Sequence, residues 1–170
     1  EIHREGKIFV QEYSQGKPYK PVEVVGEAED TGTMVTFHPD PEIFQVTTVY
    51  KYDTLAARLR ELAYLNKGIR LTLTDKRNLI NDIDENGNEL ETTHYRSDIF
   101  YSKEGLKEFV DYLDGGAEKL IEAPIYLETD KIIPIEIALQ YNTSYTEKIY
   151  SYVNNINTIE GGTHLQGFKM

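Results

Sequence analysis

The chain has 170 residues, with 18 lysines and arginines against 29 aspartates and glutamates, so its formal net charge is −11. Its 39% hydrophobic and 28% charged residues are typical of a globular protein, and its length is enough for one ordinary domain or two small ones. The absence of cysteine excludes a disulfide scaffold, a cysteine zinc site and a thiol nucleophile. The acidic total argues against a free-standing nucleic-acid-binding domain, because such domains normally carry a basic surface.

Targeting and membrane segments are not expected. No apolar stretch approaches the roughly 18–20 residues that a transmembrane helix needs. Residues 1–5 are mostly charged, which is unlike a signal peptide. The chain begins without methionine and in a segment with strand character, so we expect it to be a piece of a longer protein.

The first third of the sequence predicts β-structure. Residues 7–13 are β-prone and are expected to pair with residues 21–26. A third strand is predicted over residues 33–38. Pro39 and Pro41 end it, since proline cannot donate a hydrogen bond to a β-ladder.

A helix is predicted next. Asp53 is a plausible N-cap, and Gly68 is expected to close the segment in a left-handed conformation. Residues 69–74 then alternate with a period of two, which indicates a half-buried strand. The apolar positions of the helix recur at helical spacing and form one stripe: Leu55, Ala56, Leu59, Leu62 and Ala63.

Residues 78–97 differ in composition from the rest of the sequence. Asparagine, aspartate and glutamate dominate this acidic stretch, and residues 85–88 are a strong turn signal. It is either a hairpin with a long exposed tip or a flexible insertion. Because the composition shifts here, we place a candidate domain boundary in this stretch.

The second half predicts another amphipathic helix and several strands. The helix follows Ser102 and is stopped by Gly115 and Gly116. Thr163 is expected to cap a last helix at the end of the chain. The apolar face of the middle helix consists of Leu106, Phe109, Val110 and Leu113, and the predicted strands are 125–128, 133–141 and 148–153.

The sequence contains few residue patterns that are typical of catalytic sites. The four histidines are widely separated, so no metal site is expected and each histidine is expected to have an ordinary surface or strand role. There is no phosphate-binding glycine loop and no nucleophile-elbow motif. Composition and periodicity alone therefore predict only an α+β protein of undetermined function.

Two local stretches of sequence give more information about the function than composition does. The first is residues 30–40 (DTGTMVTFHPD) with residues 59–66 (LRELAYLN), and the second is residues 152–165 (YVNNINTIEGGTHL). In order and spacing they resemble the B subunits of type IIA DNA topoisomerases, in particular the DNA gyrase B subunit, with the topoisomerase IV B subunit as the alternative. The resemblance covers the whole chain except the acidic stretch.

The resemblance implies a fold and a domain division. Residues 1–95 are expected to form the C-terminal half of a GHKL-type ATPase α/β sandwich. Residues 96–170 are expected to form the first part of a transducer domain with a βαβ-type fold. The expected fold class is therefore α+β, with both domains incomplete.

The resemblance also implies a function for the intact protein. Members of the family couple ATP hydrolysis, with Mg²⁺, to DNA strand passage and negative supercoiling in the bacterial cytoplasm. They work with DNA and the gyrase A subunit and form a B-subunit homodimer on binding ATP, without a membrane. The family's catalytic base, magnesium ligand and glycine-rich lid are expected upstream of Glu1, and its transducer lysine beyond Met170. We therefore expect no catalytic residue and no metal ligand here, and no activity of this piece alone.

Four positions match the family's adenine site. Thr33 matches the threonine whose hydroxyl helps to hold the adenine, and Gly32 permits close backbone approach. Val35 is expected to line the adenine pocket, and Arg4 matches an arginine at its rim. The simpler interpretations are a packing or exposed threonine, a core valine and a solvated arginine.

Two other interpretations stay open. The glycines and threonine of residues 154–164 either shape a DNA-facing cavity or only build a tight strand-to-helix connection, and the second is favoured. The whole chain could also be a non-enzymatic interaction module on an ATPase-like scaffold. A mismatch-repair or chaperone ATPase is disfavoured by the string at residues 152–165.

Overall fold

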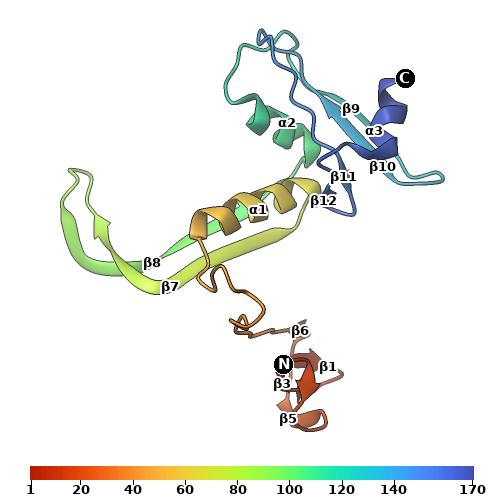
Figure 1. Cartoon of the computed structure of the whole chain (residues 1–170). Helices are drawn as coiled ribbons and strands as arrows, with labels where there is room; N and C mark the ends of the chain where they lie inside the picture. Colours follow the sequence, from red (N-terminus) through yellow and green to blue (C-terminus); the bar gives the residue numbers. More distant parts are fainter. The chain divides into compact units, whose positions relative to one another are not determined.

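The computed structural model describes residues 1–170, which divide into two compact units, residues 1–50 and residues 51–170. Each unit is described by itself. The architecture is mixed, with three α-helices and several small antiparallel sheets (Figure 1). No helix in the structure is both long enough and apolar enough to cross a membrane.

The first unit is built on a four-stranded antiparallel sheet in the order β5-β2-β1-β6. A second, two-stranded sheet pairs β3 with β4 through a turn at Gln15 and Gly16, both with positive φ. The strands are β1 (Ile2–Arg4), β2 (Lys7–Val10), β3 (Tyr13–Ser14), β4 (Lys17–Pro18), β5 (Glu23–Glu27) and β6 (Gly32–Thr33).

The predicted pairing of residues 7–13 with residues 21–26 is confirmed by the β2–β5 ladder. The strand predicted over residues 33–38 is wrong beyond Thr33. Its only partner, β1, begins at Ile2, and the Met34 N–H donates to the Glu1 carbonyl as the last bond of the ladder. Without a further partner, residues 34–38 have no ladder to join.

The second unit is centred on α1 (Tyr52–Leu65), which packs against the long hairpin of β7 (Arg70–Ile83) and β8 (Glu89–Tyr101) (Figure 1). The predicted apolar stripe is confirmed in this core. Phe100 of β8 packs against this stripe of α1. The buried residues are Tyr52, Ala56, Ala63 and Phe100, with Leu59, Leu71 and Leu73 packed against them.

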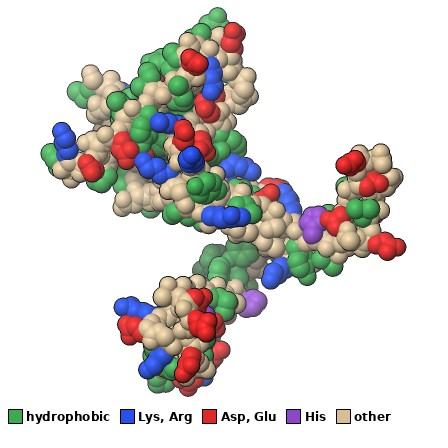
Figure 2. All heavy atoms as spheres, turned by 180° about the vertical axis from the view of Figure 1, so that it is seen from behind, with side chains coloured by type: hydrophobic (Ala, Val, Ile, Leu, Met, Phe, Trp, Pro, Cys, Tyr) green, Lys and Arg blue, Asp and Glu red, His purple; other side chains and the backbone are tan.

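The acidic stretch forms the outer part of this hairpin, so the hairpin interpretation holds and the flexible insertion does not. The turn is organised by Asp84, whose carboxylate accepts hydrogen bonds from the N–H groups of Asn86 and Asn88 at 2.8 Å. Figure 2 shows acidic side chains gathered on the outer end of the hairpin. Strand β8 runs without a break across the predicted boundary at residues 95–96, and the domain division stays a prediction.

Neither predicted helix cap is present. Helix α1 begins after Lys51 with no side-chain cap, and Asp53 instead pairs with Arg96 at 2.6 Å. The last helix, α3 (Gly162–Lys169), begins after Gly161 without a cap from Thr163. The left-handed conformation predicted for Gly68 is confirmed by its φ of 85°.

The remaining elements follow the predicted order, and the strands predicted over residues 133–141 and 148–153 are shorter than expected. Helix α2 ends at Asp114, just before the glycines predicted to stop it, and Gly115 caps it in a left-handed conformation. The strand predicted over residues 133–141 begins only after Pro134, which has no N–H to donate. The elements are α2 (Leu106–Asp114), β9 (Ile125–Thr129), β10 (Ile135–Leu139), β11 (Tyr152–Val153) and β12 (Ile156–Asn157).

Candidate functional site

The residues predicted to bind adenine lie along one edge of the first unit's sheet. Thr33 pairs with Ile2 and Gly32 pairs with His3, so β6 borders β1. Residues directly opposite share a face of an antiparallel pair, and strand side chains alternate. The side chain of Thr33 therefore lies on the same face as that of Arg4, and Val35 follows just beyond the strand.

This edge is open. Val35 is 76% exposed and is not a core residue of this unit. Thr33 is exposed, and the Arg4 guanidinium makes only an exposed contact of 3.3 Å with Glu5. A small hydroxyl beside an apolar side chain suits one wall of an adenine pocket. The structure contains no group of three or more histidine, cysteine or acidic side chains that could hold a metal ion.

The opposite face carries a group that sequence reasoning did not single out. The His3 ring lies between the carboxylates of Asp30 and Glu1, at 2.7 Å and 2.9 Å from its two nitrogens. Hydrogen bonds to Asp30 and then to Glu1 raise the pKa of His3 above its ordinary value. The pKa of Asp30 is lowered by the same contact. Only the pairing of β1 with β6 brings these residues together.

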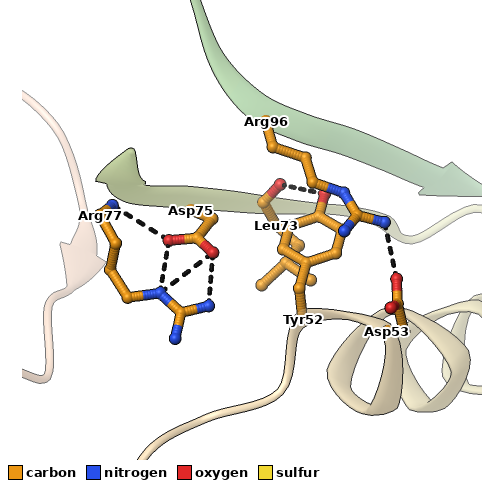
Figure 3. A network of polar contacts seen from close by, with 6 residues as sticks. All are labelled: Tyr52, Asp53, Leu73, Asp75, Arg77 and Arg96. Carbon is orange, nitrogen blue, oxygen red and sulfur yellow. Dashed lines mark hydrogen bonds and ion pairs between the residues drawn. The ribbon is translucent and has the colours of Figure 1, made fainter. Parts of the chain in front are cut away.

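In the second unit, a polar network joins the start of α1 to the hairpin (Figure 3). The Tyr52 hydroxyl lies 2.8 Å from the Asp98 carboxylate and 3.3 Å from the Leu73 carbonyl. Arg96 lies over the Tyr52 ring and pairs with Asp53. Burial, followed by the hydrogen bond to Asp98, raises the pKa of Tyr52.

A second contact in Figure 3 lies within β7. The Arg77 side chain and its backbone N–H donate to the Asp75 carboxylate, with Nε at 2.8 Å and the N–H at 3.0 Å. These hydrogen bonds lower the pKa of Asp75 to about 2. The contact lies where the β7–β8 register shifts after Asp75, and it stabilises the irregular backbone there.

Residues 59–66, the second part of the first string, contact the second string. From α1, the Glu61 carboxylate accepts hydrogen bonds from the Tyr152 hydroxyl and from Arg58. Arg58 also donates to the Asn155 carbonyl at 2.7 Å. The Asn155 amide donates to the Asn66 side chain at 2.9 Å. Residues about 90 positions apart in the sequence thus form one polar cluster.

The turn that presents Asn155 explains the paired asparagines. Asn154 and Asn155 have φ values of 49° and 65° and connect β11 directly to β12. Both central residues of a two-residue hairpin turn of this type need positive φ, which asparagine tolerates. This turn joins two strands, and the interpretation of residues 154–164 as a tight strand-to-helix connection stays a prediction. A Cβ on Gly161 would also come within 2.8 Å of the Leu165 side chain.

Lys67, just after α1, makes a further polar contact with the β9–β10 hairpin. Its ammonium lies 3.2 Å from Glu128 and 3.5 Å from Glu136. The Tyr126 hydroxyl donates toward the same two carboxylates. Burial and these carboxylates raise the pKa of Tyr126.

Comparison with known proteins decides the family. The DNA gyrase B family model matches residues 105–170. The DNA gyrase B subunit of Eisenibacter elegans is 56% identical over 169 residues, which are 99% of this chain and 33% of that protein. The DNA gyrase B subunit of Clostridium acetobutylicum is 48% identical over 99% of this chain and 24% of that protein. The chain belongs to the DNA gyrase B family.

The structural comparison agrees. The crystal structure of the 43K ATPase domain of Thermus thermophilus gyrase B in complex with an aminocoumarin matches with a TM-score of 0.79 and 35% identity. The match covers 99% of this chain and 42% of that one. The predicted α+β class and the likeness to a gyrase B ATPase domain are thereby confirmed. The chain spans about a third of the length of the first gyrase B relatives it matches.

Proposed function

We propose that the chain is a working part of a DNA gyrase B subunit and supplies one wall of the adenine pocket of its ATPase. The intact subunit would bind ATP and Mg²⁺, dimerise on ATP binding, and act with the gyrase A subunit on DNA in the bacterial cytoplasm. Its reaction would be ATP hydrolysis coupled to strand passage and negative supercoiling. The topoisomerase IV alternative is not favoured, because the matched relatives are named as B subunits of DNA gyrase.

The observation that carries this proposal is the shared placement of Thr33 and Arg4. Both side chains occupy one face at the β1–β6 edge, with Val35 directly after it. A hydroxyl can both donate and accept a hydrogen bond, which suits an adenine edge or an intervening water. The exposure of this edge leaves its hydroxyl available to a ligand.

The groups that perform the chemistry would lie on other segments of the subunit. The base that activates water, the magnesium ligand and the phosphate-binding lid have no counterpart among the residues of the β1–β6 edge. We therefore expect the purified 170-residue chain to hydrolyse no ATP. Turnover that persists through repeated purification would contradict the assignment of these groups to other segments.

The test is Thr33→Val in the intact subunit, reconstituted with the gyrase A subunit. Valine keeps the shape and strand propensity of threonine and removes only the hydroxyl. The KM for ATP should rise about tenfold, as expected for the loss of one hydrogen bond in a pocket. Thr36→Val is the matched control, since Thr36 is an exposed threonine outside the strand. Equal KM values for the two variants would contradict the proposed role of Thr33.

The intact protein should also introduce negative supercoils into relaxed plasmid in the presence of ATP. Decatenation without supercoiling would indicate the topoisomerase IV alternative. Neither reaction, in a folded and reconstituted preparation, would favour the non-enzymatic interaction module.

A further inference from the structure

The tip of the β7–β8 hairpin contains an asparagine that is directly followed by glycine. Asn86–Gly87 is the only such pair among the nine asparagines of the sequence. The pair lies in the turn between Ile83 and Glu89, where the ladder of the two strands ends, at the far end of the hairpin from α1 (Figure 1). Residues 85–91 are all exposed, so water reaches this peptide bond freely.

The Asn86 side chain has no contact that would hold it in place. Its amide makes no hydrogen bond, whereas the amide of Asn88 donates to the Asp84 carboxylate at 3.0 Å. A Cβ placed on Gly87 would meet no atom within 4 Å, so the glycine side of the peptide bond is also unobstructed. The pair is thus open on both sides.

This arrangement permits a reaction between the main chain and the side chain. The Gly87 nitrogen attacks Asn86 Cγ, the Cγ–Nδ2 bond breaks, and ammonia leaves with the proton of the attacking nitrogen. Glycine hinders this attack least, because it has no Cβ. Water then opens the resulting succinimide ring at either carbonyl, which gives aspartate or isoaspartate. Water is the only co-reactant, and nothing is oxidised or reduced.

The folded turn opposes the first step. The Gly87 N–H donates to the Asp84 carbonyl at 3.0 Å, and the Asp84 N–H donates to the Asn88 carbonyl at 2.9 Å. The Asp84 carboxylate accepts the N–H groups of Asn86 and Asn88 at 2.8 Å. The attacking nitrogen is therefore engaged while the turn is closed, and its N–H has to be released before it can react.

We propose that Asn86 is a site of spontaneous deamidation and that the turn centred on Asp84 sets its rate. The reaction proceeds in the molecules whose hairpin tip is open, because local opening releases the Gly87 N–H. An exposed turn opens far more often than an apolar core does, so the α1–β7–β8 core stays folded during the reaction. This inference is independent of the proposed function.

The product differs from the original turn in charge and in geometry. A carboxylate replaces a neutral amide beside Glu85, in a chain whose net charge is already −11. In isoaspartate the main chain runs through Cβ and Cγ, which adds one carbon to the path of the turn. The hydrogen bonds that Gly87 and Asn88 donate to Asp84 depend on the original path, so the modified tip is looser.

The test is incubation of the 170-residue chain at neutral pH and physiological temperature, followed by peptide mapping with mass spectrometry. Asn86 should be converted at least about tenfold faster than Asn88, whose amide is hydrogen-bonded and whose next residue is glutamate. Asn86→Gln should abolish the signal at this position, because glutamine would have to close a larger and less favourable ring.

A pair of variants tests the role of the turn. Asp84→Ala removes the hydrogen bonds to Asn86 and Asn88 and should raise the rate at Asn86 about fivefold to thirtyfold. Glu85→Ala removes the same charge from a side chain that makes no hydrogen bond, and should change the rate by less than about twofold. Hydrogen exchange of the Gly87 N–H should accelerate in Asp84→Ala as much as the deamidation does, while the amides of α1 exchange as before.

Each part of the proposal can fail by itself. Equal conversion of Asn86 and Asn88 in the wild-type chain overturns the assignment of the site. An unchanged rate in Asp84→Ala, or an equal rise in Glu85→Ala, overturns control by the turn. Faster exchange of the α1 amides in Asp84→Ala overturns it too, since the reaction would then follow unfolding of the core.

Discussion

The guanidinium carbon of Arg96 lies 3.8 Å from the centre of the Tyr52 ring, and the same guanidinium donates to Asp53 at 2.6 Å. The Tyr52 hydroxyl contacts Asp98 at its other end. The ring is therefore held by a cation and by a carboxylate at the first turn of α1. These contacts with β8 stabilise the start of a helix that has no side-chain cap.

Substitutions at Tyr52 should separate its hydroxyl from its ring. Tyr52→Phe keeps the ring under Arg96 and removes the hydrogen bond to Asp98, so we expect a loss of about 1–1.5 kcal/mol in the free energy of unfolding. Tyr52→Leu also removes the aromatic face and should cost about 2–4 kcal/mol. Urea denaturation of the chain measures both. Equal losses would show that the cation–ring contact contributes nothing.

The tightest position on α1 should reject a larger side chain. Ala63 is 2% exposed against the β7–β8 core, so Ala63→Leu should destabilise the chain by about 1–3 kcal/mol through overpacking. Ala57→Leu is the control, because Ala57 is an exposed alanine on the same helix and should change stability by less than about 0.5 kcal/mol. Similar unfolding midpoints for the two variants would contradict this packing.

Much of the fold could be predicted from local pattern. Three features depend only on residues close together in the sequence, and all three are found where they were expected. They are the apolar stripe around Leu59, the hairpin turn near Asp84 and the glycine at position 115, Gly115. The predictions are wrong where the local structure depends on a residue that is distant in the sequence. Asp53 suits a helix cap, yet Arg96 from β8 binds its carboxylate instead. The strand starting at Thr33 ends early because of where its partner β1 begins.

In the candidate sites too, some features could be predicted from the sequence and others depend on distant partners. The resemblance was enough to select Thr33 and Arg4, and the register of β1 with β6 then places them on one face. The contact of Glu61 with Tyr152 could not be derived from periodicity, because 91 positions separate the two residues. A signal was present in the sequence. Both residues lie within the strings that carried the family resemblance.

The His3 cluster should give a measurable pH dependence. The pKa of His3 is raised in the folded chain by Asp30 and Glu1, so its stabilisation is fully present below the unfolded value near 6.5. It is lost as the pH rises through the raised, folded pKa. The pKa of Asp30 is lowered, so its contribution is lost as the pH falls through that lowered value. NMR titration of the His3 ring should give a pKa above 6.5, and Asp30→Asn should bring it down. An unchanged His3 pKa in Asp30→Asn would contradict the contact.

The outer part of the β7–β8 hairpin should be dispensable for folding. Asp75 pairs with Arg96, and the residues that α1 contacts in its core lie on the helix side of this pair. Replacing residues 76–95 by Asn-Gly leaves this pair flanking a two-residue turn of the kind that antiparallel hairpins favour. The Arg77–Asp75 contact is lost together with the irregular backbone that it stabilises, and the shorter loop costs less entropy to close. Thermal and urea unfolding should therefore show a stability within about 1 kcal/mol of the full chain, or higher. The same replacement with Gly-Pro is the control and should be less stable, because proline cannot adopt the positive φ that the second position of this turn needs. A loss of more than about 2 kcal/mol in the Asn-Gly variant would show that the acidic part of the hairpin supports the core.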